Sequence, residues 1–320
     1  MKFKNLVNLY NNYKLFKNGI ENWFSVAINM IILKREVTCK IKNIGSVKVE
    51  KGENLLNSSL FRAVVSSNSE NISNKQKKIL KTYLNQMKDE IVTITNLEDE
   101  REFKFINKEI FTIFESFFYG EYENIPYCNS KKNLIDIGAN LGDTALYFAN
   151  KGYDVIAFEP LPNICEIAYK NIGLNPQYKE KIRFINKAVS YKKGKITIGY
   201  DNNNSASAGE FKKFNNEIEV ETITIEDILQ EYHIKPDILK IDCEGCEVNI
   251  IKNSDLSMFS EIIMEYHTNF TGVDENILID ILEKENFRLE SIKKGNTIQG
   301  SQGSYSLWEF RTFIYGTGEH

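Results

Sequence analysis

The chain of 320 residues is poor in the residue types that mark special scaffolds, with five prolines, five cysteines, three histidines and two tryptophans. So little proline excludes a collagen-like or proline-rich chain. Five scattered cysteines, an odd number, do not fit the disulfide framework of a small secreted protein. With 42% hydrophobic and 26% charged residues, the composition is that of a globular protein of one or two domains.

The sequence also lacks an apolar stretch long enough to cross a membrane. The most apolar early segment, residues 23–33, contains Asn29 and is much shorter than the roughly 20 residues that a bilayer requires. The residues before it are polar and have no continuous apolar core of the kind found in a secretory signal. From these features we expect a cytoplasmic protein.

The net charge of the chain is small, but basic and acidic residues are unevenly distributed along it. The formal net charge is −4, whereas residues 1–60 hold ten Lys and Arg against four Asp and Glu. A net acidic chain argues against a nucleic-acid partner. For the basic residues 1–34, with Trp23 and Phe24, three interpretations stay open: a helix on an anionic membrane surface, a cap on the neighbouring domain, or the surface of a homo-oligomer.

A polar stretch over residues 120–132 divides the chain into two predicted domains. Residues 1–120 are expected to form an extension of helices and β-hairpins. Residues 121–320 alternate apolar strands with helices, which indicates an α/β fold with a mainly parallel sheet covered on both faces. Residues 195–200 and 218–222 read as an inserted pair of strands. The final strands, 287–292 and 306–314, have no helix between them and indicate an antiparallel edge hairpin.

The most informative motif is LIDIGANLGDT, residues 134–144. An apolar strand contains Asp136, and Gly138 and Gly142 follow in a turn that precedes a helix. Glycines allow a tight bend and the close approach of a ligand, and the start of a helix offers free N–H groups. The spacing is neither that of the dinucleotide motif GxGxxG nor that of a Walker loop.

A second acid, Glu159, lies 23 residues after Asp136, at the tip of the next predicted strand. An acid in this place of a βαβ unit is suited to accept hydrogen bonds from the two hydroxyls of a ribose. The glycine turn and Glu159 together predict a cofactor that contains a nucleoside.

Four segments together resemble the FkbM-type methyltransferases, which use S-adenosylmethionine: IDIGANLGDT (135–144), FEP (158–160), NKAVS (186–190) and LKIDCEGCE (239–247). The resemblance covers roughly residues 118–292 and implies a Rossmann-like class I methyltransferase fold. It implies O-methylation of a small molecule, sugar or glycan. The cofactor-binding residues that it implies are Asp136, Gly138, Asn140, Gly142 and Asp143 around the methionine end, Glu159 at the ribose, Asn186 and Ala188 beside the adenine, and Asp242 near the methyl group.

Methyl transfer to a hydroxyl requires in-line alignment and a base. The candidate catalytic residues are Asp242, Glu244 and His267, each near the carboxyl end of a predicted strand. The alternative for His267 is a hydrogen-bonded residue at a strand end. Lys240 is either part of the catalytic group or a structural partner of Asp242 or Glu244, and both interpretations stay open.

Three further features of the sequence give only weak predictions. Cys243 and Cys246 have CxxC spacing, but no second CxxC or histidine pair accompanies them, so we expect packing residues and no zinc. No Asp-Asn pair follows the fifth strand, and we expect no other metal. The small polar segment 202–209 is predicted as a loop, either one that contacts substrate or an ordinary turn.

Two alternative functions remain at this point. The first is N-methylation or methylation of nucleic acid, against which stands the absence of an NPPY-like tetrapeptide at the fourth strand. The second is a scaffold that binds S-adenosylmethionine without catalysis. The presence of Asp136, Glu159 and Asp242 together favours an enzyme.

Overall fold

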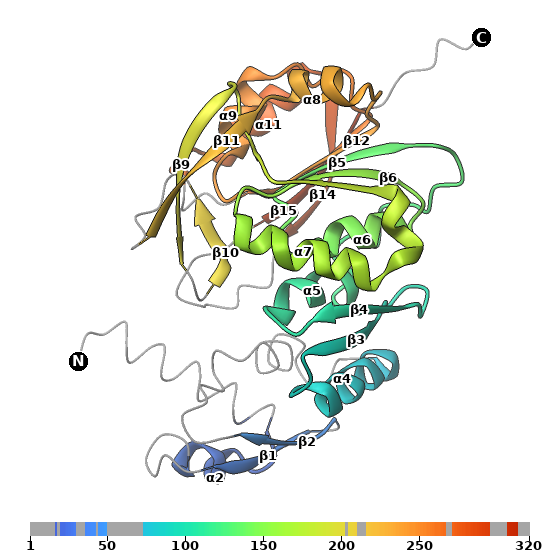
Figure 1. Ribbon diagram of the computed structural model, residues 1–320, viewed down its shortest axis with the longest axis vertical. Coiled ribbons are helices and arrows are strands. Elements are labelled where there is room, and N and C mark those ends of the chain that lie inside the picture. The colour runs from blue at the N-terminus through green and yellow to red at the C-terminus, as the bar shows by residue number, and fades with distance from the viewer. Residues whose placement is uncertain are drawn as a thin grey trace. The chain divides into compact units, whose positions relative to one another are not determined.

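The computed structural model describes residue 17 and residues 20–29, 36–42, 44–49, 73–201, 204–209, 216–266, 271–294 and 306–312. The chain divides into two compact units after Asn124, where the sequence placed the boundary at residue 120 (Figure 1). No helix in the described ranges has the length and apolar character that a membrane span requires. Most of residues 1–34, for which a membrane or oligomer surface was predicted, lie outside the described ranges.

The first unit contains two antiparallel hairpins. One pairs β1 (Val37–Ile41) with β2 (Gly45–Val49), and the other pairs β3 (Ile91–Thr95) with β4 (Glu102–Ile106). Its helices are α2 (Trp23–Ala27), α4 (Asn74–Gln86) and α5 (Ile110–Phe117). The start of α4 is held by a capping box, in which Ser73 and Gln76 each satisfy a backbone N–H of the other. The described residues of this unit thus contain both helices and hairpins.

Aromatic side chains form the core between β4 and α5. Phe103 and Phe105 are two residues apart on β4, so their side chains point to the same face. Phe114 and Phe117 lie on one side of α5. All four side chains are fully buried. The Phe103 and Phe117 ring centroids are 4.6 Å apart, within the range of favourable aromatic contact. Phe117 thus joins the helix to the hairpin.

The second unit is built on a seven-stranded sheet. Its strands are β5 (Asn133–Ile137), β6 (Asp154–Phe158), β7 (Ile182–Ile185), β12 (Ile238–Ile241), β13 (Glu261–Tyr266), β14 (Phe287–Lys294) and β15 (Ser306–Thr312). They lie in the order β14-β15-β13-β12-β5-β6-β7. The five strands from β13 to β7 pair in parallel, and β15 pairs antiparallel with both of its neighbours.

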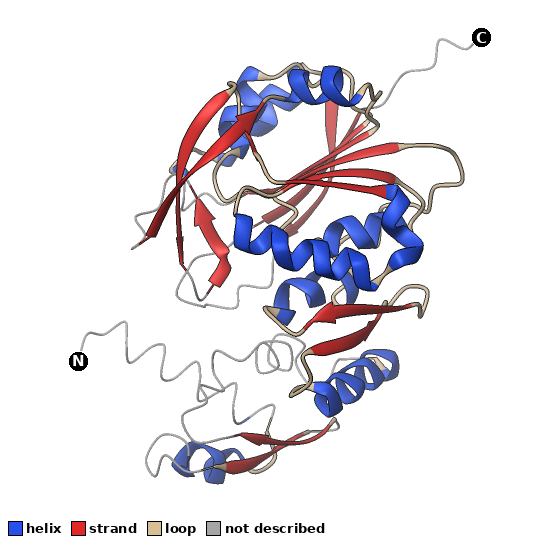
Figure 2. Ribbon diagram, viewed as in Figure 1, coloured by secondary structure: helices blue, strands red, loops and turns tan. Residues whose placement is uncertain are grey.

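Helices cover both faces of this sheet, as Figure 2 shows. One face carries α6 (Asp143–Asn150) and α7 (Pro162–Leu174), and the other carries α8 (Ile225–Tyr232), α9 (Glu247–Asn253) and α11 (Glu275–Lys284). A short 3-10 helix, η3 (Pro176–Lys181), leads into β7. The strands are mostly apolar because both of their faces are buried, and the charged Asp136 in β5 and Lys240 in β12 are exceptions. The predicted Rossmann-like fold is confirmed.

The final hairpin lies at the edge of the sheet, as predicted. β14 and β15 pair antiparallel as expected, but β15, the last strand of the chain, inserts between β13 and β14. The strand at the sheet edge is therefore β14. Chain order alone did not reveal this arrangement, because the pairing of β15 with β13 is a long-range contact.

A second sheet of four strands, in the order β10-β9-β11-β8, interrupts the series after β7. Its members are β8 (Ala188–Val189), β9 (Gly194–Asp201), β10 (Asn204–Gly209) and β11 (Asn216–Ile223). The prediction of an inserted strand pair was right, but the loop predicted over 202–209 was wrong for residues 204–209. Their small polar side chains give no strand signal, and the strand forms through backbone pairing with β9.

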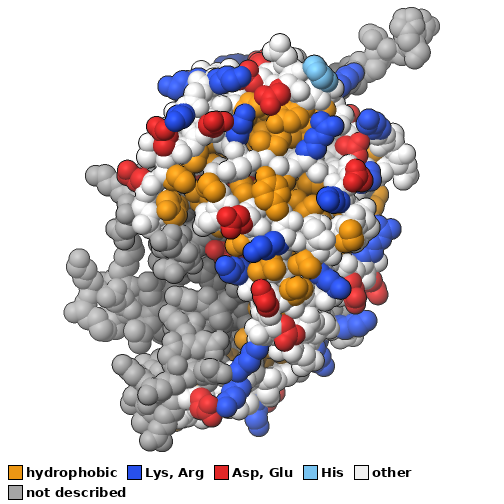
Figure 3. Space-filling view, in the orientation of Figure 1, with side chains coloured by type: hydrophobic (Ala, Val, Ile, Leu, Met, Phe, Trp, Pro, Cys, Tyr) orange, Lys and Arg blue, Asp and Glu red, His pale blue; other side chains and the backbone are white. Residues whose placement is uncertain are grey.

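The surface of the described residues mixes both signs of charge. Figure 3 shows acidic and basic side chains interspersed, with apolar side chains between them. Tyr169 on α7 and Ile277 on α11 are among the large apolar residues that are exposed. The face in view therefore offers no broad basic field of the kind that attracts a nucleic-acid backbone.

The aromatic core of the first unit predicts unequal effects of two Phe→Ala substitutions. Phe117→Ala removes a buried ring and should lower the free energy of unfolding by about 3–5 kcal/mol. Phe24→Ala, the control, removes a ring that is 62% exposed and should change it by less than about 0.5 kcal/mol. Chemical denaturation of the full chain measures both values, and equal losses would contradict the assigned core.

Candidate functional site

The strand order places a ligand site at the carboxyl ends of β5 and β12. The chain runs from β5 to β6 to β7 on one side, then crosses to place β12 on the other side of β5. Ligands in open α/β sheets bind beside such a switch point. Because β5 and β12 are parallel and in register, Asp136 lies directly opposite Lys240.

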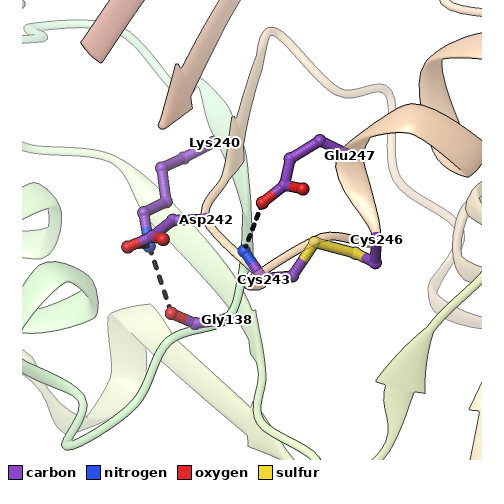
Figure 4. The surroundings of a disulfide bond; sticks show 6 residues. All are labelled: Gly138, Lys240, Asp242, Cys243, Cys246 and Glu247. Carbon is purple, nitrogen blue, oxygen red and sulfur yellow. Dashed lines mark hydrogen bonds and ion pairs between the residues drawn. A yellow bond between two sulfur atoms is a disulfide. The ribbon is translucent and has the colours of Figure 1, made fainter. Parts of the chain in front are cut away.

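Lys240 is the centre of a buried ionic group (Figure 4). Its Nζ lies 3.1 Å from Oδ1 of Asp136 and 3.7 Å from Oδ2 of Asp242, and it donates a hydrogen bond of 3.1 Å to the carbonyl oxygen of Gly138. Burial lowers the pKa of the Lys240 ammonium, but the carboxylates of Asp136 and Asp242 outweigh this and leave the pKa raised. Lys240 is therefore charged, and an ammonium cannot accept a proton.

Asp136 is fully shielded from solvent and joins three elements. One carboxylate oxygen contacts Lys240 on β12, and the other accepts a hydrogen bond of 2.5 Å from Oγ1 of Thr144 in the first turn of α6. A buried charge is tolerated only when it is paired in this way. Asp136 thus lies beneath the glycine turn and holds it between the two strands and the helix.

The glycine turn itself is packed against the end of β12. Gly138 has φ +78°, and a Cβ atom there would lie 1.8 Å from the carbonyl oxygen of Asp242. The backbone N–H groups of Gly138 and Ala139 both donate to the carbonyl oxygen of Phe158 at 3.0 Å. Only glycine fits between these neighbours. Gly142, with φ +74°, then ends the turn before α6, whose first residue, Asp143, is buried.

Glu159 has the geometry of a diol acceptor. Its Oε2 accepts from the backbone N–H of Asn140 at 3.1 Å, and its Oε1 accepts from that of Leu161 at 3.0 Å. A carboxylate has about four lone-pair positions, so one on each oxygen remains for a ligand. Burial raises the pKa of Glu159 to about 7, although the two amide donors and the charge of Lys240 oppose that rise.

The two residues expected beside the adenine lie after β7. The side-chain amide of Asn186 donates to the carbonyl oxygens of Glu159 and Pro160, at 2.9 and 2.8 Å. Ala188 is buried in β8. Asn186 therefore belongs to the same cluster as Glu159, and the contact of both residues with an adenine stays a prediction.

The three candidate bases differ in their positions in the structure. Asp242 follows β12 and its side chain is 26% exposed, so it can meet a ligand while paired with Lys240. Glu244 lies two residues further on, in a turn where its φ is +55°. His267 lies outside the described residues. The structure thus brings Asp136, Lys240 and Asp242 into one ionic group.

Sequence reasoning missed a disulfide. Cys243 and Cys246, expected to be packing residues, are bonded to each other, with their Cα atoms 5.5 Å apart. The positive φ angles of Glu244 and Gly245 bend the chain so that the cysteines meet. Their CxxC spacing was the available signal. Among the described residues, no group of three or more His, Cys, Asp and Glu is arranged to hold a metal ion.

The chain is similar to known methyltransferases. Residues 136–289, just under half of the chain, match the methyltransferase FkbM domain. Over 188 residues, the chain is 29% identical to methyltransferase sdnD of Sordaria araneosa. The match covers 48% of this chain and 70% of that protein. Over 164 residues, it is 26% identical to hexuronic acid methyltransferase AglP of Haloferax volcanii. That match covers 50% of this chain and 65% of that protein.

The fold is also similar to solved structures. One is TrmK of M. capricolum in complex with S-adenosyl-homocysteine, with a TM-score of 0.38 and 16% sequence identity. The match covers 60% of this chain and 67% of that chain.

The buried carboxyl of Glu159 predicts a pH-dependent stability. Its pKa is about 7 in the folded state against 4.5 for the ordinary group, so the folded state binds the proton more tightly. The resulting stabilisation is complete below pH 4.5 and is lost as the pH rises through 7, a change of about 3 kcal/mol. Denaturation at several pH values should show this fall relative to Glu159→Gln.

The control for this experiment is Glu166→Gln, which changes an exposed glutamate on α7. Its free energy of unfolding should follow that of the unmodified protein at every pH. A Glu159→Gln variant that does the same would contradict the buried, proton-binding state of Glu159.

Proposed function

We propose that residues 136–289, which match the methyltransferase FkbM domain, transfer a methyl group from S-adenosylmethionine to a hydroxyl of a sugar or glycan. The observation that carries the proposal is the pairing of Glu159 with the glycine turn. Two carboxylate lone-pair positions suited to a ribose diol lie beside a turn whose backbone comes close to Asp242.

The residues present fit the cofactor. Glu159 would hold the ribose hydroxyls, and the backbone of residues 138–143 would receive the methionine end, with Asn140 and Asp143 in that segment. Asn186 orients the end of β6 through its bonds to Glu159 and Pro160 and would lie on the adenine side with Ala188. When bound, S-adenosylmethionine supplies an electrophilic methyl group on a sulfonium.

Asp242 is the proposed base. It lies at the carboxyl end of β12, is accessible to a ligand, and is held by Lys240 at 3.7 Å. It would accept the proton of the acceptor hydroxyl as the oxygen takes the methyl group. Lys240 limits the motion of the carboxylate, and fixed alignment of reacting groups is a large part of such catalysis. Glu244, in the following turn, and His267 are the other proposed contributors.

The acceptor class rests on the relatives. AglP is named a hexuronic acid methyltransferase, and the chain shares with it a segment that makes up half of this sequence. A sugar hydroxyl is therefore the proposed nucleophile, and nucleic acid is not a proposed partner. The cytoplasmic location, peripheral membrane contact through residues 1–34 and a homo-oligomer stay predictions of the sequence.

The cofactor site predicts a loss of binding when Glu159 is truncated. Glu159→Ala removes the acceptor of the ribose diol and should weaken the binding of S-adenosylhomocysteine at least tenfold, or about 1.4 kcal/mol. Glu166→Ala, on the exposed side of α7, should leave the affinity unchanged. Isothermal titration calorimetry measures both, and full affinity of Glu159→Ala would reject the site.

The proposed reaction predicts where a labelled methyl group goes. With labelled S-adenosylmethionine, uronic-acid oligosaccharides should be labelled, and neutral oligosaccharides and RNA offered in parallel should be labelled less or not at all. Asp242→Asn should keep cofactor affinity within a few fold but lower kcat by about 100-fold or more, because the proton acceptor is lost. Label in RNA alone would contradict the proposed acceptor, and unchanged kcat would contradict the base.

A further inference from the structure

The disulfide between Cys243 and Cys246 lies in the turn that joins β12 to α9, immediately after Asp242 (Figure 4). Both cysteines are half-buried, so small molecules can reach them. The three other cysteines are free. Two of these, Cys39 and Cys165, are buried, and burial raises the pKa of each thiol to about 12, which disfavours the reactive thiolate.

The turn that carries the disulfide is joined to the proposed cofactor site by backbone contacts. The N–H of Asp242 donates to the carbonyl oxygen of Ile137 at 3.0 Å. A Cβ atom on Gly138 would lie 3.4 Å from the Cα of Cys243, in addition to its clash with the carbonyl oxygen of Asp242. The backbone at Asp242 and Cys243 therefore lies close to the glycine turn.

The other side of the same turn is also anchored. The N–H of Cys243 donates to Oε1 of Glu247 at 3.1 Å, and Glu247 is completely buried. Between the two cysteines, Glu244 and Gly245 hold positive φ angles, a conformation that is unfavourable for a residue with a side chain such as Glu244. The disulfide offsets the tendency of these residues to relax, because it fixes both ends of the turn.

We propose that Cys243 and Cys246 form a reversible thiol–disulfide pair whose oxidation state sets the affinity of the neighbouring site for S-adenosylmethionine. The inference rests on the proposed function for the identity of that ligand. The oxidised turn is preorganised against Gly138, and preorganisation favours binding because less motion is lost. The reduced turn has more freedom and binds the cofactor more weakly.

The chemistry is thiol–disulfide exchange with a small disulfide as oxidant. The thiolate of one cysteine attacks the small disulfide and releases one thiolate, and the second cysteine then attacks the mixed disulfide and releases the other. The Cys243–Cys246 bond forms, the bond of the small disulfide breaks, and two electrons pass to it. The two protons from the cysteines end on the two released thiolates. Reduction by a dithiol is the reverse.

The test measures redox state and binding on the full chain. The protein is equilibrated in mixtures of reduced and oxidised dithiothreitol, alkylated, and examined by mass spectrometry of the peptide that contains Cys243 and Cys246. Calorimetry gives the affinity for S-adenosylhomocysteine in each state. We expect binding to the oxidised form to be at least about fivefold tighter. By linkage, the ligand must make the disulfide harder to reduce by the same factor, and a tenfold difference equals about 30 mV.

Two variants make the result specific. The double variant Cys243→Ser/Cys246→Ser should bind like the reduced protein and ignore the reductant. Cys128→Ser, which removes the half-buried free cysteine, should respond to the reductant as the unmodified protein does. The ligand-induced shift in the unmodified protein is an independent measure should the double variant not fold.

The outcomes separate the two proposals. Equal affinity of the oxidised and reduced forms, or no disulfide at Cys243 under oxidising conditions, would overturn the redox inference alone. Binding of S-adenosylhomocysteine to neither form, with the cysteine pair still titrating, would instead contradict the proposed cofactor site.

Discussion

The charge of Lys240, held inside the sheet, is the constraint on which the site depends. An ammonium that is 2% exposed is stable there only because Asp136 and Asp242 neutralise it and Gly138 accepts its hydrogen bond. The same contacts decide where the glycine turn lies and how Asp242 is oriented. Removal of Lys240 would leave Asp136 buried without an ionic partner, so these two residues act together across β5 and β12.

Around this unit, each strand end contributes one function. β5 provides Asp136 and the turn, β6 provides Glu159, and β12 provides Lys240 and Asp242. The carboxyl ends of parallel strands meet at one edge of the sheet. The strand order reverses at β5, because β6 and β7 lie on one side of it and β12 lies on the other. In the proposed methyltransferase, the methyl donor and the acceptor would meet at this edge. The disulfide next to Asp242 adds a covalent constraint to the same edge.

The sequence was informative where a signal is local. Apolar runs with strand lengths predicted the parallel sheet, and the turn around Gly138 with Glu159 predicted a nucleoside site in one βαβ unit. The strand over residues 204–209 was missed because its side chains give no strand signal and it forms through backbone pairing with the preceding strand, β9. The place of β15 beside β13 was not predicted because these two strands are distant in the chain. His267, a candidate base, stays a prediction because it lies outside the described residues.

The sequence by itself determined the α/β fold, the glycine turn and the acids at the strand ends, because periodicity and motif spacing are properties of short segments. Only the tertiary structure showed that Lys240 pairs with Asp136 and Asp242 and that Cys243 and Cys246 are bonded. Lys240 and Gly138 are 102 residues apart, and their contact exists only because β12 lies beside β5. The cysteines are close in sequence, but their bond depends on the bend that the positive φ angles of Glu244 and Gly245 give the chain.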